Sequence, residues 1–185
     1  IQWVEGNYYR KLGKERTVKN FPIPANKGNV YSADGSLLAT SIPEYTIYFD
    51  AVAPTSELFK ENIQALSDSL SVMFGKSSGH YQAKLQKARA NKSRYVFIAK
   101  KLSYTEHMRL KTFPLFNKGA NKGGLIIEQK IVREHPIGLV AKRTIGYERS
   151  NEDGKGLEYA FRDSLNGKNG HRMMQKIDKN QWKPI

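Results

Sequence analysis

The longest periodic segment of the chain, residues 56 to 74, limits the folds that the sequence can adopt. Its apolar residues recur at spacings of three, four and five, at Leu58, Ile63, Leu66, Leu70 and Met73. This spacing predicts one amphipathic helix whose apolar stripe faces a core. A second, basic helix is expected over residues 81 to 91, where Tyr81, Leu85 and Ala88 share one side.

The rest of the chain alternates between strand-like runs and short helices. Asp34-Gly35 between the runs at 30–32 and 37–40 predicts a hairpin, because this pair adopts the unusual dihedral angles of a tight turn. In the middle of the chain we expect strands over 45–49 and 94–99, a capping box at Ser103 and Glu106, a flexible turn over 119–124 and a strand over 125–132. A short helix or turn should then run through Leu139, Val140 and Ile145. The last expected elements are a helix over 156–165 that ends at Asn166-Gly167 and a hairpin that starts at 173–177 and closes near Trp182. This irregular mixture predicts an α+β fold of helices and hairpins in small subdomains rather than a doubly wound sheet.

The first 20 residues form a lead-in that differs from the rest of the chain. Trp3, Val4, Tyr8 and Leu12 lie at near-helical spacing and predict a short helix. The Phe-Pro-Ile-Pro segment at 21–24 predicts extended backbone, so we expect the ordered domain to cover residues 21–185. No apolar run approaches the roughly 20 residues that span a bilayer, and we expect any membrane anchor to lie upstream.

The chain is strongly basic and has no cysteine. It carries 31 Lys and Arg against 17 Asp and Glu, a net charge of +14. Such a charge favours polyanions, namely nucleic acid, anionic lipid or an anionic wall polymer, and a solvated basic surface is an equally weighted interpretation. The absence of cysteine excludes disulfides and thiolate metal sites.

Motifs that carry catalytic or cofactor chemistry are absent from the sequence. Gly75-Lys76-Ser77 lacks the first glycine of a phosphate loop, and Gly154-Lys155-Gly156 lacks the third glycine of a dinucleotide site. The histidines, which we expect at the surface, have no metal-ligand spacing; they are His80, His107, His135 and His171. No cofactor, metal ligand or catalytic residue is therefore assigned, and an enzyme with an unrecognised site is the least favoured alternative.

Tyr95-Val96-Phe97 stands among basic residues and superficially resembles an RNA-binding strand. The Gly-aromatic-Gly frame that lets bases stack is missing, so core packing is the favoured interpretation of these side chains. A basic nucleic-acid-binding domain remains an alternative on charge alone, and its binding would fall steeply with salt.

Three motifs in order resemble the pedestal region of class B penicillin-binding proteins. The first covers residues 27–39, the second covers 133–147 and the third covers 156–170. Their matching positions are Lys27, Gly28, Asp34 and Gly35; Arg133, Pro136, Gly146 and Tyr147; and Gly156, Leu157, Glu158, Gly167 and Gly170. Lys27, Ser32 and His135 differ from the residues usual in the family.

The resemblance implies the non-catalytic pedestal, or dimerisation, domain of a cell-division transpeptidase. It implies a serine-type D,D-transpeptidase domain after residue 185, since no Ser here has Lys three residues later. It also implies anchoring at the periplasmic face of the bacterial cytoplasmic membrane. The implied partners are the septal glycosyltransferase, regulatory bitopic proteins and the chain's own C-terminal domain, with no nucleic acid. An elongation-type pedestal is the runner-up. We also expect Arg133 and Glu158 to pair.

Overall fold

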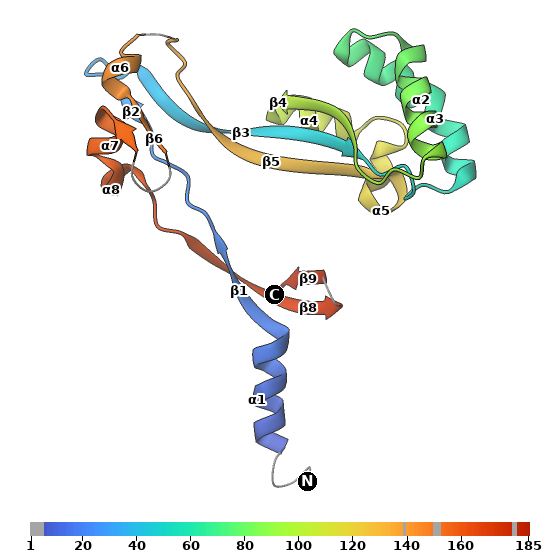
Figure 1. The fold of residues 1–185 in the computed structure, drawn as a ribbon, viewed down its shortest axis with the longest axis horizontal. Coiled ribbons are helices and arrows are strands. Elements are labelled where there is room, and N and C mark those ends of the chain that lie inside the picture. The colour runs from blue at the N-terminus through green and yellow to red at the C-terminus, as the bar shows by residue number, and fades with distance from the viewer. Residues whose placement is uncertain (1–5, 139, 150–152, 179–180) are drawn as a thin grey trace. The chain divides into compact units, whose positions relative to one another are not determined.

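A computed structural model describes residues 6–138, 140–149, 153–178 and 181–185 (Figure 1). The chain divides into two compact units. Unit 1 combines Ile1–Ser41 with Glu134–Ile185, and unit 2 is Ile42–Arg133. Helices and strands are mixed in both, so the α+β prediction is confirmed.

Unit 2 contains the helices α2 and α3 beside one end of an open antiparallel sheet. The strand β3 (Leu37–Phe49) starts in unit 1 and continues into unit 2, where it pairs with β4 and β5. The other elements of unit 2 are α2 (Ser56–Phe74), α3 (Ser78–Ala90), β4 (Val96–Leu102), α4 (Tyr104–Lys111), the 3-10 helix η1 (Phe116–Lys118), α5 (Gly119–Gly123) and β5 (Leu125–Glu134).

The helix α2 has the bounds that its sequence predicts. At its start the Thr55 hydroxyl accepts a hydrogen bond from the Leu58 amide at 3.3 Å. At its end Gly75 takes a left-handed conformation, φ 75°, and its amide donates to the Ser71 carbonyl at 2.8 Å. The buried side of the helix carries Phe59, Ile63, Leu66, Ser67 and Leu70.

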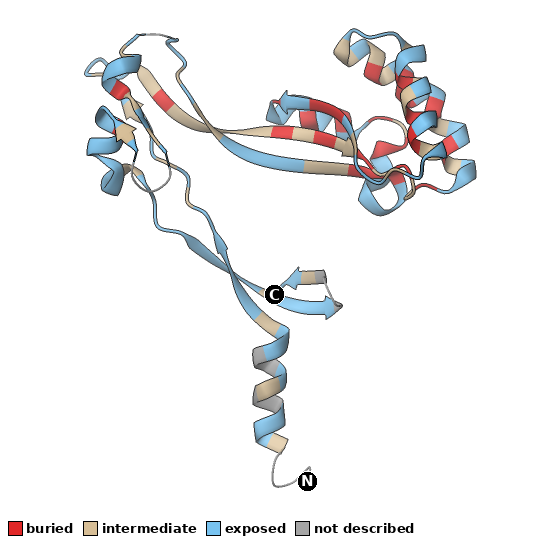
Figure 2. Cartoon of the chain, viewed as in Figure 1, coloured by how far each residue is buried: buried red, intermediate tan, exposed pale blue. Residues whose placement is uncertain are grey.

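The main apolar core lies in unit 2, where the buried residues of Figure 2 concentrate. It is built around Phe49 of β3, whose ring lies 6.3 Å from that of Phe59 and 6.0 Å from that of Phe116. Leu66 and Leu70 of α2 and Leu85 of α3 are fully buried against it. Such burial stabilises by about 1.5–3 kcal/mol for each large side chain, so unit 2 has its own hydrophobic driving force.

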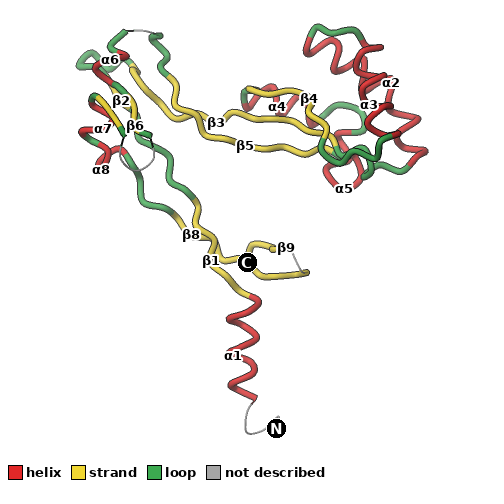
Figure 3. The backbone as a smooth tube through the Cα atoms, in the orientation of Figure 1, coloured by secondary structure: helices red, strands yellow, loops and turns green. Residues whose placement is uncertain are grey.

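Apart from the longer helix α1, unit 1 consists mostly of extended ribbons and single-turn helices (Figure 3). Its elements are α1 (Gly6–Thr17), β1 (Val18–Ile23), β2 (Val30–Tyr31), the start of β3, α6 (Lys142–Ile145), β6 (Tyr147–Glu148), β7 (Gly154–Lys155), α7 (Leu157–Ala160), α8 (Arg162–Leu165), β8 (Gly170–Asp178) and β9 (Gln181–Pro184). Antiparallel pairing joins β1 to β8 and β8 to β9, and a two-stranded ribbon joins β6 to β7. The predicted Asp34-Gly35 hairpin is confirmed, with Val30 opposite Ala39.

Three local predictions are wrong. The strands expected over 37–40 and 45–49 form one continuous strand, β3, in which the pairing with β2 ends at Ala39 and the pairing with β4 begins at Tyr45. Residues 119–123 form the helix α5 rather than a turn, with the Gly124 amide donating to the Ala120 carbonyl at 3.0 Å. The helix expected over 156–165 divides into α7 and α8 at Phe161, whose φ of −106° interrupts the helical backbone.

Two predictions of side-chain environment are also wrong. His107 is 5% exposed, because its ring stacks on Tyr45 at 4.1 Å, and burial lowers its pKa. Tyr95 and Phe97 are 53% and 43% exposed rather than in the core. They lie against Tyr48 on the outer side of the sheet, with ring distances of 4.0 and 6.0 Å. Leu139 lies outside the described residues.

Candidate functional site

The predicted motifs meet in unit 1 around the Lys27 side chain. Lys27 follows β1 and forms an isolated antiparallel bridge with Asn166. The next amide, that of Gly28, donates to the Leu165 carbonyl at 2.8 Å. The backbone thus fixes Lys27 beside the end of α8, which belongs to the third motif.

Two carboxylates converge on the Lys27 ammonium group. It forms an ion pair with Glu148 at the end of β6, and its Nζ lies 3.6 Å from Oε2 of Glu158 in α7. The Asn166 amide also donates to both oxygens of Glu148, at 3.1 and 3.2 Å. We call Lys27, Glu148, Glu158 and Asn166 the Lys27 junction.

The Lys27 junction is partly removed from solvent, which strengthens its electrostatics. The side chains of Lys27, Glu148 and Glu158 are 23%, 17% and 3% exposed. Hydrogen bonding from Lys27 is the main reason that the pKa of Glu148 lies below its ordinary value, with a further contribution from Asn166. A carboxylate with a lowered pKa stays ionised at neutral pH and is a poor general acid. The junction is therefore suited to holding segments together.

A close contact between two glycines supports the junction. Gly146 precedes β6 and Gly156 follows β7, with φ angles of +70° and +74°. A Cβ on Gly146 would lie 1.8 Å from the Lys155 carbonyl oxygen, and one on Gly156 would lie 2.4 Å from that of Thr144. Only glycine fits both the dihedral angle and the space at these positions. This contact places Glu148 and Glu158 on adjoining turns.

The other predicted site residues are distributed over unit 1 and one position of unit 2. Gly167 approaches Ala25, since its Cβ would be 3.0 Å from that of Ala25. Tyr147 and Leu157 are exposed, with the Arg149 guanidinium 5.0 Å from the Tyr147 ring. Pro136 is exposed, and Gly170 begins β8 opposite Ile23.

The first motif also builds the turn between β2 and β3. The Asp34 carboxylate accepts hydrogen bonds from the Ser32 hydroxyl and from the Ser36 amide, the latter at 3.1 Å. The Ser32 bond is the main cause of a pKa for Asp34 below its ordinary value. Gly35 follows with φ +84°, as this turn requires. Ser32, which departs from the family pattern, thus takes part in the turn.

The pairing expected between Arg133 and Glu158 stays a prediction. Arg133 belongs to unit 2 and Glu158 to unit 1. Within unit 1, Glu158 forms an ion pair with Lys27.

Sequence reasoning did not find Glu148 and Asn166. Both stand directly beside predicted motif residues, Glu148 after Tyr147 and Asn166 before Gly167. The sequence signal that could have found them is their position next to glycine-bearing turns, because a polar side chain there can contact a neighbouring segment.

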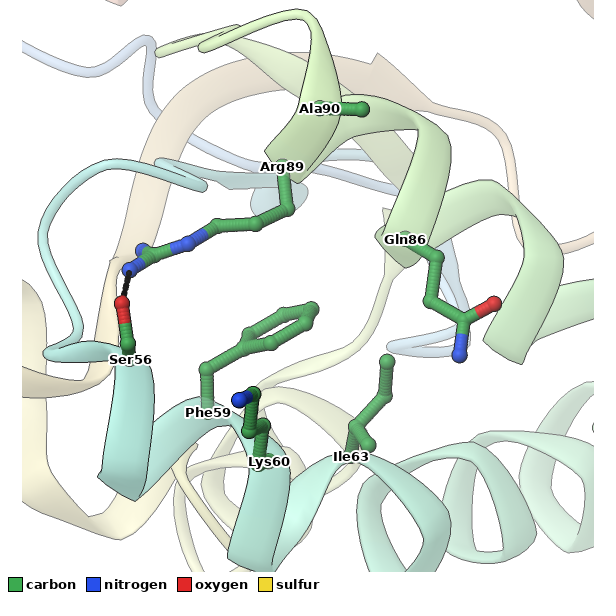
Figure 4. Close-up of a pocket in the computed structure, with 7 residues that line it drawn as sticks. All are labelled: Ser56, Phe59, Lys60, Ile63, Gln86, Arg89 and Ala90. Atoms are coloured by element: carbon green, nitrogen blue, oxygen red, sulfur yellow. Dashed lines mark hydrogen bonds between the residues drawn. The ribbon is translucent and has the colours of Figure 1, made fainter.

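A groove between α2 and α3 in unit 2 has a volume of about 520 Å³ (Figure 4). Its lining residues are Ser56, Phe59, Lys60, Ile63, Gln86, Arg89 and Ala90. Arg89 reaches across it and donates to the carbonyl of Pro54 at 2.7 Å and to the Ser56 hydroxyl at 3.2 Å. Its guanidinium also lies 5.4 Å from the Phe59 ring. Arg89 thus ties the start of α2 to α3 and has a structural role.

No helix in the described part of the chain combines the length and the apolar character needed to cross a bilayer.

Comparison with known proteins agrees with the motifs. The chain is 27% identical, over 173 residues, to a probable peptidoglycan D,D-transpeptidase PenA of Neisseria meningitidis serogroup A, and 26% identical to that of Neisseria gonorrhoeae. These matches cover 92% of this chain and 27% of each relative, so the chain spans about a quarter of their length.

The fold is similar to that of penicillin-binding protein 2X from Streptococcus thermophilus. The TM-score is 0.61 at 20% identity, over 90% of this chain and 28% of the other. The family described as the penicillin-binding protein dimerisation domain matches residues 22–183. The chain therefore belongs to this family of class B pedestals, which its three motifs resemble.

Proposed function

We propose that this chain is the non-catalytic pedestal of a peptidoglycan D,D-transpeptidase that acts in septal cell-wall synthesis. The observation that carries the proposal is the family match over residues 22–183. The relatives named as probable D,D-transpeptidases support the activity of the parent protein. We assign residues 1–20 to the lead-in, 21–185 to the pedestal and the serine-type catalytic domain to the sequence after 185.

The geometry of unit 1 supports a positioning role. A pedestal has to hold a catalytic domain at a defined place, which requires segments that do not shift against one another. The Lys27 junction and the glycine contact join the end of β1, the β6–β7 ribbon and the α7–α8 turns through backbone and charge together. No step of transpeptidation is assigned to these residues.

Location and partners follow from the proposed role. We place the parent at the periplasmic face of the bacterial cytoplasmic membrane, anchored by an N-terminal helix. Its proposed partners are the septal glycosyltransferase, regulatory bitopic proteins and its own transpeptidase domain, with the anionic membrane surface or wall polymer as targets of the basic charge.

Labelling with a fluorescent penicillin tests the proposal. The 185-residue chain is compared with the natural protein extended beyond residue 185. We expect a covalent label only on the extended protein, because the acylated serine lies outside this chain. Labelling of the 185-residue chain, or an unlabelled extension without Ser-x-x-Lys, contradicts the proposal.

A fluorescent fusion of the whole parent separates septal from elongation function. Accumulation at the division site supports the septal assignment. A distribution along the side wall, with cell widening on depletion, supports the elongation type instead and leaves the pedestal assignment unchanged.

A further inference from the structure

The sheet of β1, β8 and β9 in unit 1 is unusually exposed. Every residue of β1 after Val18 is exposed, and in β8 the residues from Gly170 to Ile177 are exposed except Met174 (Figure 2). The exposed side chains include large apolar ones, with Phe21 and Ile23 each 41% exposed. Clustered apolar exposure of this kind marks an interaction surface.

The strand register defines one face of this sheet. Lys19, Phe21 and Ile23 of β1 lie opposite Met174, Arg172 and Gly170 of β8, and Lys176 lies opposite Trp182 of β9. Residues directly opposite in an antiparallel pair share a face, and so do alternate residues of one strand. We call the resulting set the basic aromatic face; it contains Lys19, Phe21, Ile23, Arg172, Lys176 and Trp182.

Contacts between the aromatic rings agree with this register. The Phe21 and Trp182 rings meet edge to face with centroids 5.2 Å apart. The Lys19 ammonium lies 5.8 Å from the Trp182 ring. Trp182 therefore joins β9 to β1 across β8, with an apolar ring on a face whose long basic side chains reach into solvent.

The segments that form this sheet, and the helix before it, concentrate positive charge. Residues 1–23 and 168–185 together hold ten Lys and Arg against three Asp and Glu. In α1, which leads directly into β1, Tyr8 and Tyr9 are 64% and 54% exposed. Aromatic rings beside Lys and Arg are typical of surfaces at the boundary between lipid headgroups and acyl chains.

We propose that the basic aromatic face binds an anionic lipid surface. The ligand has to offer negative charge to Lys19, Arg172 and Lys176 and an apolar layer to Phe21 and Trp182, and anionic headgroups above acyl chains supply both. A soluble anionic polymer supplies only the charge. The proposal deepens the proposed function, on which it rests for location, by naming the face and the lipid class.

Vesicle binding tests the proposal directly. The 185-residue chain carrying Trp3→Phe, so that Trp182 is the remaining tryptophan, is mixed with phosphatidylcholine vesicles with or without about a third of phosphatidylglycerol. We expect binding and a blue shift of Trp182 emission with the anionic vesicles alone, reversed by salt. We also expect brominated acyl chains to quench Trp182. Equal binding to both vesicles, or no quenching, overturns the proposal.

Paired variants locate the binding surface. The double variant Lys19→Gln/Lys176→Gln is expected to lower the partitioning of the protein onto anionic vesicles about twenty-five-fold, because each basic side chain contributes about fivefold. Lys100→Gln with Lys122→Gln, exposed residues of unit 2, makes the same change in net charge and is expected to leave partitioning nearly unchanged. An equal loss of vesicle binding in both double variants would mean that the protein binds through its net charge, and it would overturn the assignment of binding to the basic aromatic face.

The apolar contribution is tested with Phe21→Ala and Trp182→Ala together, followed by sedimentation. Partitioning that is unchanged in this variant means attraction by charge alone, as for a wall polymer, and overturns the lipid assignment. If this variant does not fold, quenching of Trp182 by brominated acyl chains in the protein that retains Phe21 and Trp182 shows whether the aromatic rings enter the lipid. Penicillin labelling needs no lipid, so a failure of lipid binding is distinguishable from a failure of the proposed function.

Discussion

Replacing Gly156 with alanine is expected to destabilise unit 1 strongly. A non-glycine residue at φ +74° costs about 1–2 kcal/mol by itself. The added Cβ would also lie 2.4 Å from the Thr144 carbonyl oxygen and 2.8 Å from that of Ile145, and such overpacking costs about 1–3 kcal/mol. The total is about 2–5 kcal/mol, and the contacted atoms are backbone atoms that cannot rotate away.

Two matched substitutions separate the causes. Gly35 has φ +84° with nothing within 4 Å of an added Cβ, so Gly35→Ala is expected to cost the conformational part alone, about 1–2 kcal/mol. Gly13 lies within α1 with nothing within 4 Å, so Gly13→Ala is expected to stabilise by about 0.5–1 kcal/mol.

Urea unfolding followed by tryptophan fluorescence measures these differences. Trp182 lies in unit 1, so in a Trp3→Phe background its emission reports the unfolding of this unit. A loss of about 3 kcal/mol lowers the urea midpoint by roughly 1–3 M. If Gly156→Ala lowers the midpoint no further than Gly35→Ala, the close contact between the two glycine turns does not stabilise the unit, and the reasoning is refuted.

Two further predictions concern charge. Lys27→Met is expected to destabilise unit 1 by about 2–3 kcal/mol at neutral pH, because Glu148 and Glu158 lose a partly buried cation. The pKa of Glu148 is lowered from 4.5, so its contribution to the stability of the unaltered protein is present above pH 4.5 and is lost as the pH falls. The urea midpoint of the variant should therefore fall less steeply in acid than that of the unaltered protein. The lowered pKa of His107 favours its neutral ring in the folded protein, so stability is expected to fall as the pH drops below 6.5. His107→Gln should make the thermal midpoint less dependent on pH in this range. The control His80→Gln, at an exposed site, should leave the pH dependence unchanged.

The sequence predicts well the elements whose causes are local. The bounds of α2 follow from a repeating apolar spacing, a Thr55 cap and a Gly75 end, all within a few residues of one another. The Asp34-Gly35 turn and the Ser103–Glu106 capping box are predicted for the same reason. Each of these structures depends on neighbours in the sequence, so the sequence contains the whole signal.

Contacts between distant segments are less accessible from sequence. Lys27 and Glu148 are ordinary charged residues with no period, and nothing in either segment indicates that they meet. His107 of the helix α4 enters the core because its ring stacks on Tyr45 of the strand β3, and Tyr95 is exposed because it stacks on Tyr48 on the outer side of the sheet. In each case the deciding partner belongs to a segment far along the chain, where a pattern within one segment carries no signal.

The two units depend on different forces, and this difference bears on how the pedestal works. Unit 2 has an apolar core around Phe49, whereas the buried residues described in unit 1 include few large apolar side chains, with Ile145 the largest. Unit 1 is therefore stabilised by backbone pairing, close glycine contacts and the Lys27 junction, which fix local geometry but supply little hydrophobic driving force. A sheet that exposes Phe21 and part of Trp182 gains most from a surface that covers them. Asn166 of the junction lies just before β8 and bridges to Lys27, which follows β1, so the proposed lipid-binding sheet and the Lys27 junction are connected through the same two strands.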